Sequence, residues 1–73
     1  MNVFDLKMGE VAKIKRIDLD GSALERLNAL GVAAGEQVEV LSYSLFKSSV
    51  LVSCNAVRLG IRKPLALKIE VQK

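Results

Sequence analysis

The residue types that usually carry catalysis or bind transition metals are nearly absent from this chain of 73 residues. It has no histidine and a single cysteine, Cys54, so neither a Ser-His nor a Cys-His nucleophile pair can form. One cysteine also cannot supply the several nitrogen and sulfur ligands that zinc and iron sites use. We therefore expect no catalytic residue, no cofactor and no metal site, and the chain is predicted not to be an enzyme.

Other residues whose side chains could take part in catalysis or metal binding have simpler structural explanations. Asp18 and Asp20 have part of the spacing of a calcium loop, but the further oxygen ligands and the closing glutamate are missing. They suit a turn before a helix, where acidic groups complement the helix dipole. Cys54 is in phase with the valines of its predicted strand, so we expect it to be a small apolar side chain of the core. Residues 31–35 lack the Gly-Lys-Ser/Thr ending of a phosphate-binding loop.

Tyr43, Leu45 and Phe46 form the first of two groups that could bind a partner protein. They lie together between two predicted strands, and apolar side chains gathered in a loop of a monomer often mark an interaction patch. The competing explanation is that one or two of them fold back onto the domain. We predict that the group contributes to partner binding, and the choice among its three side chains stays open.

The second group is basic and consists of Arg58, Arg62 and Lys63. Both arginines are out of phase with the apolar residues of their predicted strand, so their side chains should face solvent on one side. Basic side chains bind acidic groups through charge-assisted hydrogen bonds. The pattern indicates a surface for an acidic partner, although the same residues would also serve simply to keep the domain soluble.

Alternating apolar residues predict the strands that position these groups. Five short strands are expected, over residues 10–17, 37–42, 48–54, 57–62 and 67–71, with a hairpin loop at 43–47. In the first strand Ala12 and Ile14 share one face and Ile17 breaks the parity. A bulge near Lys15 and Arg16 would restore it, because a bulge adds one residue to one strand.

A short helix is predicted over residues 23–30, between the first two strands. Ser22 and Glu25 match a capping box. Gly31 suits the left-handed residue that ends many helices, and Val32 falls where a Schellman ending places its apolar contact, against Leu27. Pro64 predicts a helical turn over residues 63–66, because proline is tolerated at the first helical position. The expected apolar face of the helix comprises Ala23, Leu24, Leu27 and Leu30.

Length and composition restrict the fold to one small domain, residues 1–73. Half of the residues are apolar, with only three aromatic, so the core must be built from aliphatic side chains. Five short strands cannot make two well-covered sheets at this length. We therefore expect a mainly β protein, a small SH3-like β-barrel of about five strands with one short α-helix, which buries the alternating faces and limits exposed edges.

The net charge of +3 is unevenly distributed. Residues 1–44 hold five basic and seven acidic side chains, whereas residues 45–73 hold six basic and one acidic. Such asymmetry favours an acidic partner, a nucleic acid or an anionic membrane surface, or is an ordinary solvated face. A single cysteine, no signal-peptide pattern and no long apolar run predict a cytoplasmic protein without direct membrane insertion.

Taken in order, these features resemble the FeoA family, the small cytoplasmic component of bacterial ferrous iron uptake. The resemblance covers nearly the whole chain, and its most telling piece is residues 26–40, which read RLNALGVAAGEQVEV. Two features depart from the family pattern: Ala34 stands where a proline is common, and the Leu45-Phe46 hairpin is less polar than usual. The other matching positions are glycine or apolar residues: Gly9, Ala12, Ile14, Ile17, Leu24, Leu59, Ala66, Ile69 and Val71.

The resemblance implies an SH3-like barrel that acts as a regulatory or scaffolding accessory of FeoB, the large ferrous iron permease with a cytoplasmic GTP-binding domain. It implies a cytoplasmic protein, held at the inner membrane by that partner, and leaves self-association open.

Two other functions remain as alternatives. A small nucleic-acid-binding β-barrel would use the basic half on phosphates, but such barrels usually add several exposed aromatics, so we expect no nucleic acid partner. An SH3-like module related to metal-dependent repressors is the second alternative, and the chain has no helix-turn-helix of its own.

Overall fold

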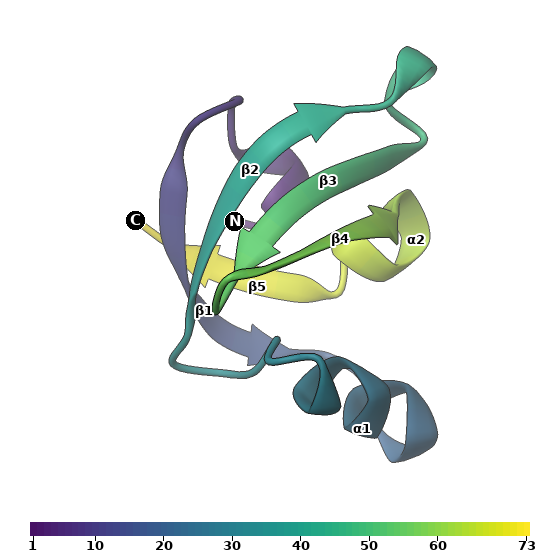
Figure 1. Cartoon of the computed structure of the whole chain (residues 1–73). Coiled ribbons are helices and arrows are strands. Elements are labelled where there is room, and N and C mark those ends of the chain that lie inside the picture. Colours follow the sequence, from purple (N-terminus) through teal and green to yellow (C-terminus); the bar gives the residue numbers. More distant parts are fainter.

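The computed structural model describes residues 1–73 as a single strongly bent antiparallel sheet with short helical segments at its ends (Figure 1). The strand order is β4-β3-β2-β1-β5. The strands are β1 (Val11–Ile17), β2 (Gln37–Tyr43), β3 (Ser49–Cys54), β4 (Val57–Arg62) and β5 (Ile69–Gln72). The helical segments are η1 (Val3–Asp5), α1 (Gly21–Ala29), η2 (Leu45–Lys47) and α2 (Lys63–Ala66). The predicted mainly β architecture with one short helix is confirmed.

The core lies on the concave side of the sheet, and all fifteen of its buried residues are apolar. β1, β2, β3 and β5 contribute alternating side chains to it, as the period of a strand requires, and β4 contributes Ile61. On β3, for example, Val50, Val52 and Cys54 are buried, while Leu51 between them is partly exposed. Full burial of one aliphatic side chain is worth about 1.5–3 kcal/mol, so a small set of Val, Ile and Leu residues suffices to hold the domain together.

Two strands contain a bulge, and only the first was predicted. The pairing of β1 with β5 shifts between Ile14 and Arg16, which confirms the bulge near Lys15. The pairing of β2 with β3 shifts between Val40 and Ser42, so Leu41 is an extra residue. A bulge reverses the alternation beyond it. Consequently the side chain of Tyr43, the last residue of β2, turns to the concave side of the sheet.

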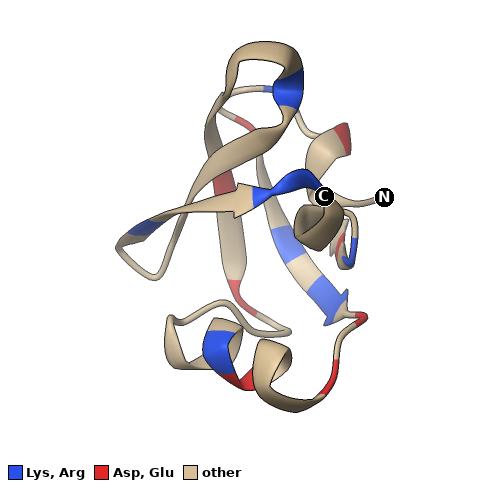
Figure 2. Ribbon diagram, turned by 90° about the vertical axis from the view of Figure 1, so that its right-hand side faces the viewer, with Lys and Arg blue, Asp and Glu red and all other residues tan.

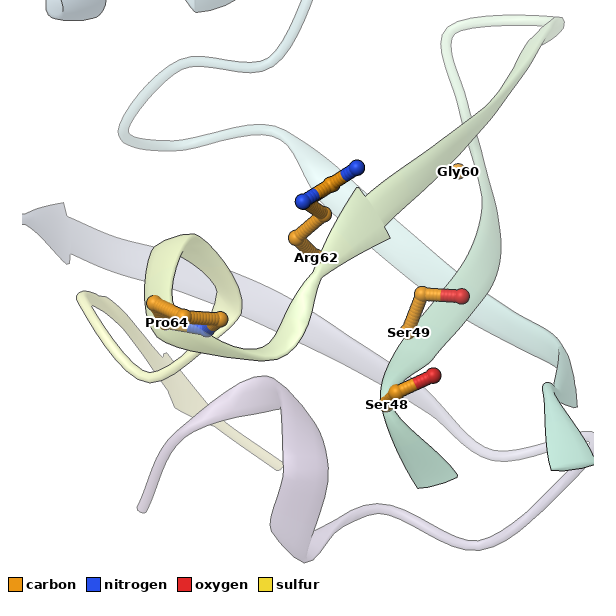
Figure 3. Close-up of a pocket in the computed structure, with 5 residues that line it drawn as sticks. All are labelled: Ser48, Ser49, Gly60, Arg62 and Pro64. Carbon is orange, nitrogen blue, oxygen red and sulfur yellow. The ribbon is translucent and has the colours of Figure 1, made fainter. Parts of the chain in front are cut away.

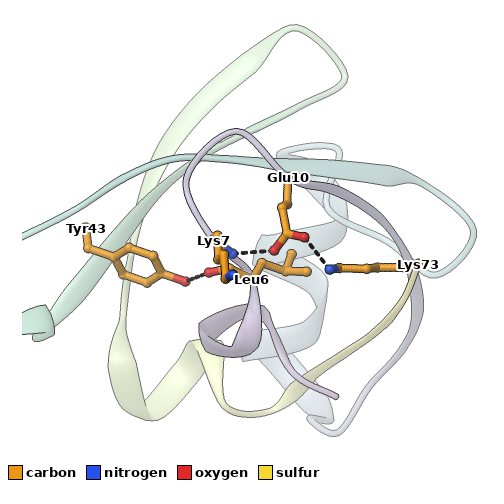
Figure 4. Close-up of polar contacts among 5 residues, drawn as sticks. All are labelled: Leu6, Lys7, Glu10, Tyr43 and Lys73. Atoms are coloured by element: carbon orange, nitrogen blue, oxygen red, sulfur yellow. Dashed lines mark hydrogen bonds and ion pairs between the residues drawn. The ribbon is translucent and has the colours of Figure 1, made fainter.

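Tyr43 therefore belongs to a strand and not to the hairpin loop in which the sequence placed it. Its hydroxyl donates a hydrogen bond to the backbone carbonyl of Leu6 (Figure 4) and also lies within hydrogen-bond distance, 3.3 Å, of the Val3 carbonyl. Its ring packs edge-on against Phe4, with 5.2 Å between ring centroids. Burial raises the pKa of the Tyr43 hydroxyl, with a smaller contribution from the negative charge of Asp5, so the proton that makes this bond is retained.

The N-terminal segment was not predicted as an element, yet it closes one end of the barrel. Its Val3 and Leu6 side chains are buried. Asn2 caps η1 by accepting a hydrogen bond from the Phe4 amide at 2.8 Å. The Met1 carbonyl accepts from the amide of Val71 at 2.7 Å, so the segment also lies along the outer edge of β5.

The end of α1 confirms the predicted Schellman motif. The Gly31 amide donates to the Asn28 carbonyl at 3.0 Å and the Val32 amide donates to the Leu27 carbonyl at 2.9 Å. Gly31 has φ of +94°, a conformation that glycine adopts at little cost. Both Val32 and Leu27 are buried in the core.

Two expectations about α1 were wrong. The helix begins at Gly21, with Asp20 as its N-cap residue and no side-chain capping bond, so Ser22 lies inside the first turn and cannot form the predicted capping box. The predicted apolar face is also incompletely covered: Leu27 is buried and Leu24 half-buried, but Ala23 is exposed and Leu30 is 47% exposed. The reason is that α1 lies at one end of the barrel and does not cross its open side (Figure 1).

We expect Tyr43→Phe to lower the free energy of unfolding by about 0.5–1.5 kcal/mol, the usual contribution of a hydrogen bond. Urea unfolding at neutral pH measures the difference. A raised folded-state pKa means that the stability contributed by the hydroxyl is present below the ordinary tyrosine pKa of about 10 and is lost as the pH rises through the folded-state value. The variant should therefore lose less stability than the parent between neutral and strongly alkaline pH, and an identical alkaline decline in both would contradict this assignment.

Candidate partner-binding site

The β2–β3 hairpin extends beyond the body of the sheet (Figure 1), and its end carries two largely exposed apolar side chains. Leu45 is 80% exposed and Phe46 is 91% exposed. Neither belongs to the core or packs against it. The structure thus separates the predicted apolar group: Tyr43 faces inward and supports the fold, whereas Leu45 and Phe46 face solvent. We call residues 44–48 the hairpin tip.

The backbone of the hairpin tip has an unfavourable conformation at Phe46. This residue has φ of +66° and ψ of +11°, and Lys47 follows with φ of +54°. The left-handed region costs a residue other than glycine about 1–2 kcal/mol. Hairpin turns often need a positive φ, as Asn55 and Ala56 show in the β3–β4 turn, but neither backbone preference nor packing on its own domain favours a phenylalanine there. Strained residues that persist in this way concentrate at functional sites.

Ser44 fixes the conformation of the hairpin tip through several hydrogen bonds of its backbone and its hydroxyl group. Its amide donates to the Ser49 carbonyl at 3.0 Å, and its Oγ accepts from the Ser49 amide at 2.9 Å. The same Oγ lies 3.1 Å from Oγ of Ser48. The Ser44 carbonyl accepts from the amide of Lys47 at 2.8 Å. The exposed phenyl ring is therefore held by an ordered turn, which lowers the entropy lost when a partner covers it.

The predicted basic group is also divided by the structure. Arg58 and Arg62 are exposed along β4, whereas Lys63 begins α2 and places its ammonium group 5.7 Å from the centroid of the Phe4 ring. The two ion pairs of the structure are Arg16–Glu70 and Glu10–Lys73, so neither arginine of β4 has a carboxylate partner. Figure 2 shows basic positions at both ends of β4 with no acidic position on that strand.

The hairpin tip and the basic strand are neighbours, which the sequence did not reveal. Ser49, the first residue of β3, pairs directly with Arg62 at the end of β4. Beside this pair lies an open hollow of about 550 Å³, lined by Ser48, Ser49, Gly60, Arg62 and Pro64 (Figure 3). Hydroxyl groups and a guanidinium therefore face the space between the tip and the strand. One partner can contact both groups at once.

Glu10 and Cys54 have structural roles. Glu10 accepts from the Lys7 amide at 2.6 Å and pairs with the ammonium group of Lys73, and these two contacts, the Lys73 bond first, lower the pKa of the Glu10 carboxyl (Figure 4). Cys54 is buried, as predicted, and its Sγ lies 3.4 Å from the Gly31 carbonyl. Burial raises the pKa of the Cys54 thiol.

Two further features of the structure concern metals and membranes. No group of three or more His, Cys, Asp or Glu side chains is arranged to hold a metal ion. No helix has the length and apolar character needed to cross a membrane.

Comparison with known proteins gives one matching family. The FeoA domain family matches residues 1–73. No curated protein sequence matches the chain.

Among solved structures, the iron(II) transport protein A of Clostridium thermocellum is 28% identical, with a TM-score of 0.92 over 99% of this chain and 44% of its own length. FeoA of Chlorobium tepidum has the same identity and TM-score and is covered over 69% of its length. This chain thus spans less than half of the first of these proteins.

Two other structures extend the comparison. FeoA of Stenotrophomonas maltophilia, complexed with zinc, is 25% identical with a TM-score of 0.82, over 99% of this chain and 89% of its own. It is described as an SH3 domain protein and a candidate activating factor of ferrous iron transport. A manganese-dependent transcriptional repressor matches with a TM-score of 0.86 at 21% identity, over 39% of its length. This last likeness is one of fold alone.

The strain at Phe46 predicts an unusual order of stabilities. We expect Phe46→Gly to be more stable than Phe46→Ala by about 1 kcal/mol, because glycine relieves the left-handed conformation and the lost ring made no core contact. At Leu45, whose φ is not positive, the order should reverse, and Leu45→Gly should be less stable than Leu45→Ala. Urea unfolding of the four variants measures both differences. If both Phe46 variants lost more than about 1 kcal/mol relative to the parent, the ring would have to pack on the domain.

Proposed function

The chain belongs to the FeoA family of ferrous iron transport, and from this membership we propose that it is a non-catalytic accessory protein that binds the cytoplasmic part of a FeoB-type permease. In this proposal the protein is cytoplasmic and reaches the inner membrane only through its partner. It adds no chemistry of its own. It acts by presenting a surface to the permease.

The observation that carries the proposal is the hairpin tip. Phe46 is 91% exposed and is held in a left-handed conformation by the hydrogen bonds of Ser44. Burying a Phe or Leu side chain is worth about 1.5–3 kcal/mol before the costs of association, and a few such anchors dominate the energy of most interfaces. Because the turn is already ordered, little conformational entropy remains to be lost on binding.

The arginines of β4 have a different part in the proposal. Arg58 and Arg62 are exposed and lack carboxylate partners within the chain. Exposed charges at the rim of an interface mainly accelerate the encounter with a complementary surface, and added salt screens this effect. Lys63 contributes less, since its ammonium group lies over the Phe4 ring.

The alternatives named from the sequence have less support. A nucleic-acid-binding barrel needs exposed aromatic side chains on which bases stack, but Tyr43 is turned inward and Phe46 is the one aromatic side chain that is largely exposed. For a repressor-like module the support is likeness of fold, and fold does not determine function.

We expect Phe46→Ala to weaken binding to the cytoplasmic part of a FeoB-type permease about tenfold or more at every salt concentration, because the variant loses buried apolar area. Isothermal calorimetry at low and high salt measures the affinity. Leu67→Ala is a matched control, since Leu67 is also an exposed apolar residue but lies in the turn after α2, away from the hairpin tip. Unchanged affinity for a folded Phe46→Ala protein would exclude the tip as the anchor.

Arg62→Glu should slow association severalfold at low salt, and the difference from the parent should shrink as ionic strength rises. Stopped-flow or surface-plasmon measurements give the association rate. Lys13→Glu makes the same change of charge on β1, which β2 and β3 separate from β4 in the sheet, and should have a smaller effect. Equal effects of the two substitutions would show that net charge, and not the surface of β4, controls the encounter.

A further inference from the structure

β4 lies at the edge of the sheet, and its backbone presents unpaired hydrogen-bonding groups to solvent. The Lys63 amide donates to the Ser48 carbonyl at 2.9 Å, which places this pair among the hydrogen-bonded positions of the β3–β4 ladder. Hydrogen-bonded and free positions alternate in an antiparallel pair. The amides of Arg58, Gly60 and Arg62 and the carbonyls of Arg58 and Gly60 therefore point away from β3, and no turn or loop contact satisfies them, whereas the Arg62 carbonyl is at the N-cap of α2.

The other edge of the sheet is covered by the chain itself. Asn2 forms a bridge with Glu70, and the Met1 carbonyl accepts from the amide of Val71, so the N-terminal segment occupies the free side of β5. Proteins usually protect edge strands in this way or by bulges and prolines. β4 has no bulge in its pairing and no proline before Pro64, and its free side is open.

Gly60, in the middle of this edge, has no role within the chain that requires glycine. Its φ is not positive, and a Cβ atom placed on it would meet nothing within 4 Å. Glycine weakens a strand, and in such positions it often marks the close approach of another backbone or ligand. Its cross-strand neighbour Leu51 is 39% exposed. Gly60 also lines the open hollow beside the Ser49–Arg62 pair.

The charges on this edge restrict what can pair with it. Arg58 and Arg62 flank Gly60 at spacings of two residues, so all three lie on one face. A second copy of β4 in antiparallel register about Gly60 would place an arginine opposite an arginine, which is unfavourable. An acidic strand would instead place a carboxylate opposite each arginine.

We propose that β4 accepts an extended acidic segment of a partner protein as a sixth strand of the sheet. The segment carries acidic side chains opposite Arg58 and Arg62 and a large side chain that covers Gly60 and the exposed flank of Leu51. Backbone hydrogen bonds along the edge supply affinity, and the side-chain pattern supplies specificity, as in other cases of strand addition. This inference deepens the proposed function and rests on it for the source of the segment, which is expected in the cytoplasmic part of the permease.

The test compares two substitutions at Gly60. Gly60→Pro removes the outward amide while leaving the bonds to β3, because proline is tolerated on an edge strand when its nitrogen faces solvent. Gly60→Ala keeps that amide and adds a methyl group in open space. The probe is the peptide Thr-Glu-Val-Tyr-Val-Glu-Thr, in which glutamate, tyrosine and glutamate share one face, and its control has lysine in place of both glutamates.

We expect the acidic peptide to bind the parent and Gly60→Ala within about threefold of each other. It should bind Gly60→Pro about tenfold more weakly, because one backbone bond is lost and an acceptor of the peptide is left unpaired. The lysine peptide should not bind. Amide hydrogen exchange on the parent gives a second readout that needs no variant: the peptide should slow exchange at Arg58, Gly60 and Arg62.

The same measurements with the cytoplasmic part of the permease separate the two proposals. Binding that is equal in Gly60→Pro and Gly60→Ala, without protection of the edge amides, would support the proposed partner and overturn strand addition. No binding of the permease, together with peptide binding that is sensitive to Gly60→Pro, would overturn the proposed partner and retain strand addition. Absence of peptide binding and of edge protection in both experiments, or pairing between copies of the protein alone, would overturn the inference.

Discussion

The extra residue Leu41 in β2 determines which side chains of the β2–β3 hairpin support the fold and which are presented to solvent. Without this bulge the alternation would turn Tyr43 outward, and the carbonyls of Val3 and Leu6 would lose the hydroxyl that ties the N-terminal segment to the barrel. With it, Tyr43 is the last residue to face the core. The chain then leaves the sheet as the hairpin tip.

The inward-facing part of the hairpin and its tip therefore have different roles. The inward face stabilises a domain whose small size leaves little excess stability, since burial of a few aliphatic side chains must offset the conformational entropy of the whole chain. The outward tip does not help the core, and its left-handed backbone at Phe46 costs stability. In a domain with so little excess stability, such a cost is readily explained when the exposed ring has a partner. The pair Ser49–Arg62 joins the hairpin tip to the open edge of β4.

Sequence patterns predicted those features that depend on residue types close together in the chain. The bulge near Lys15 was visible because Ile17 breaks the alternation of β1, and the end of α1 was visible because Gly31 and Val32 have the residue types of a Schellman motif. The bulge at Leu41 has no such signature in the sequence. Leu41 is itself apolar, and a strand that reads apolar through residues 38, 40 and 41 fits two registers equally well.

The sequence indicated which residues to consider as a partner-binding site but not how they are arranged. Loop position alone could not divide Tyr43 from Phe46, because the division depends on the bulge before them. The left-handed conformation of Phe46 runs against the preference of its residue type, so no sequence rule would place it there. The hollow beside Gly60 and the pairing of Ser49 with Arg62 depend on long-range register, which a single sequence does not encode locally.

The central claim is that the hairpin tip is the surface through which this protein contacts its partner. Isotope-filtered nuclear Overhauser spectra of the labelled protein, in complex with the unlabelled cytoplasmic part of a FeoB-type permease, test it most directly. The account predicts intermolecular contacts from the Phe46 ring and the Leu45 methyl groups, with the backbone of the hairpin tip unchanged in conformation. Contacts confined to the partly exposed face of α1, around Leu24 and Leu30, with the Phe46 ring still free in solvent, would contradict it.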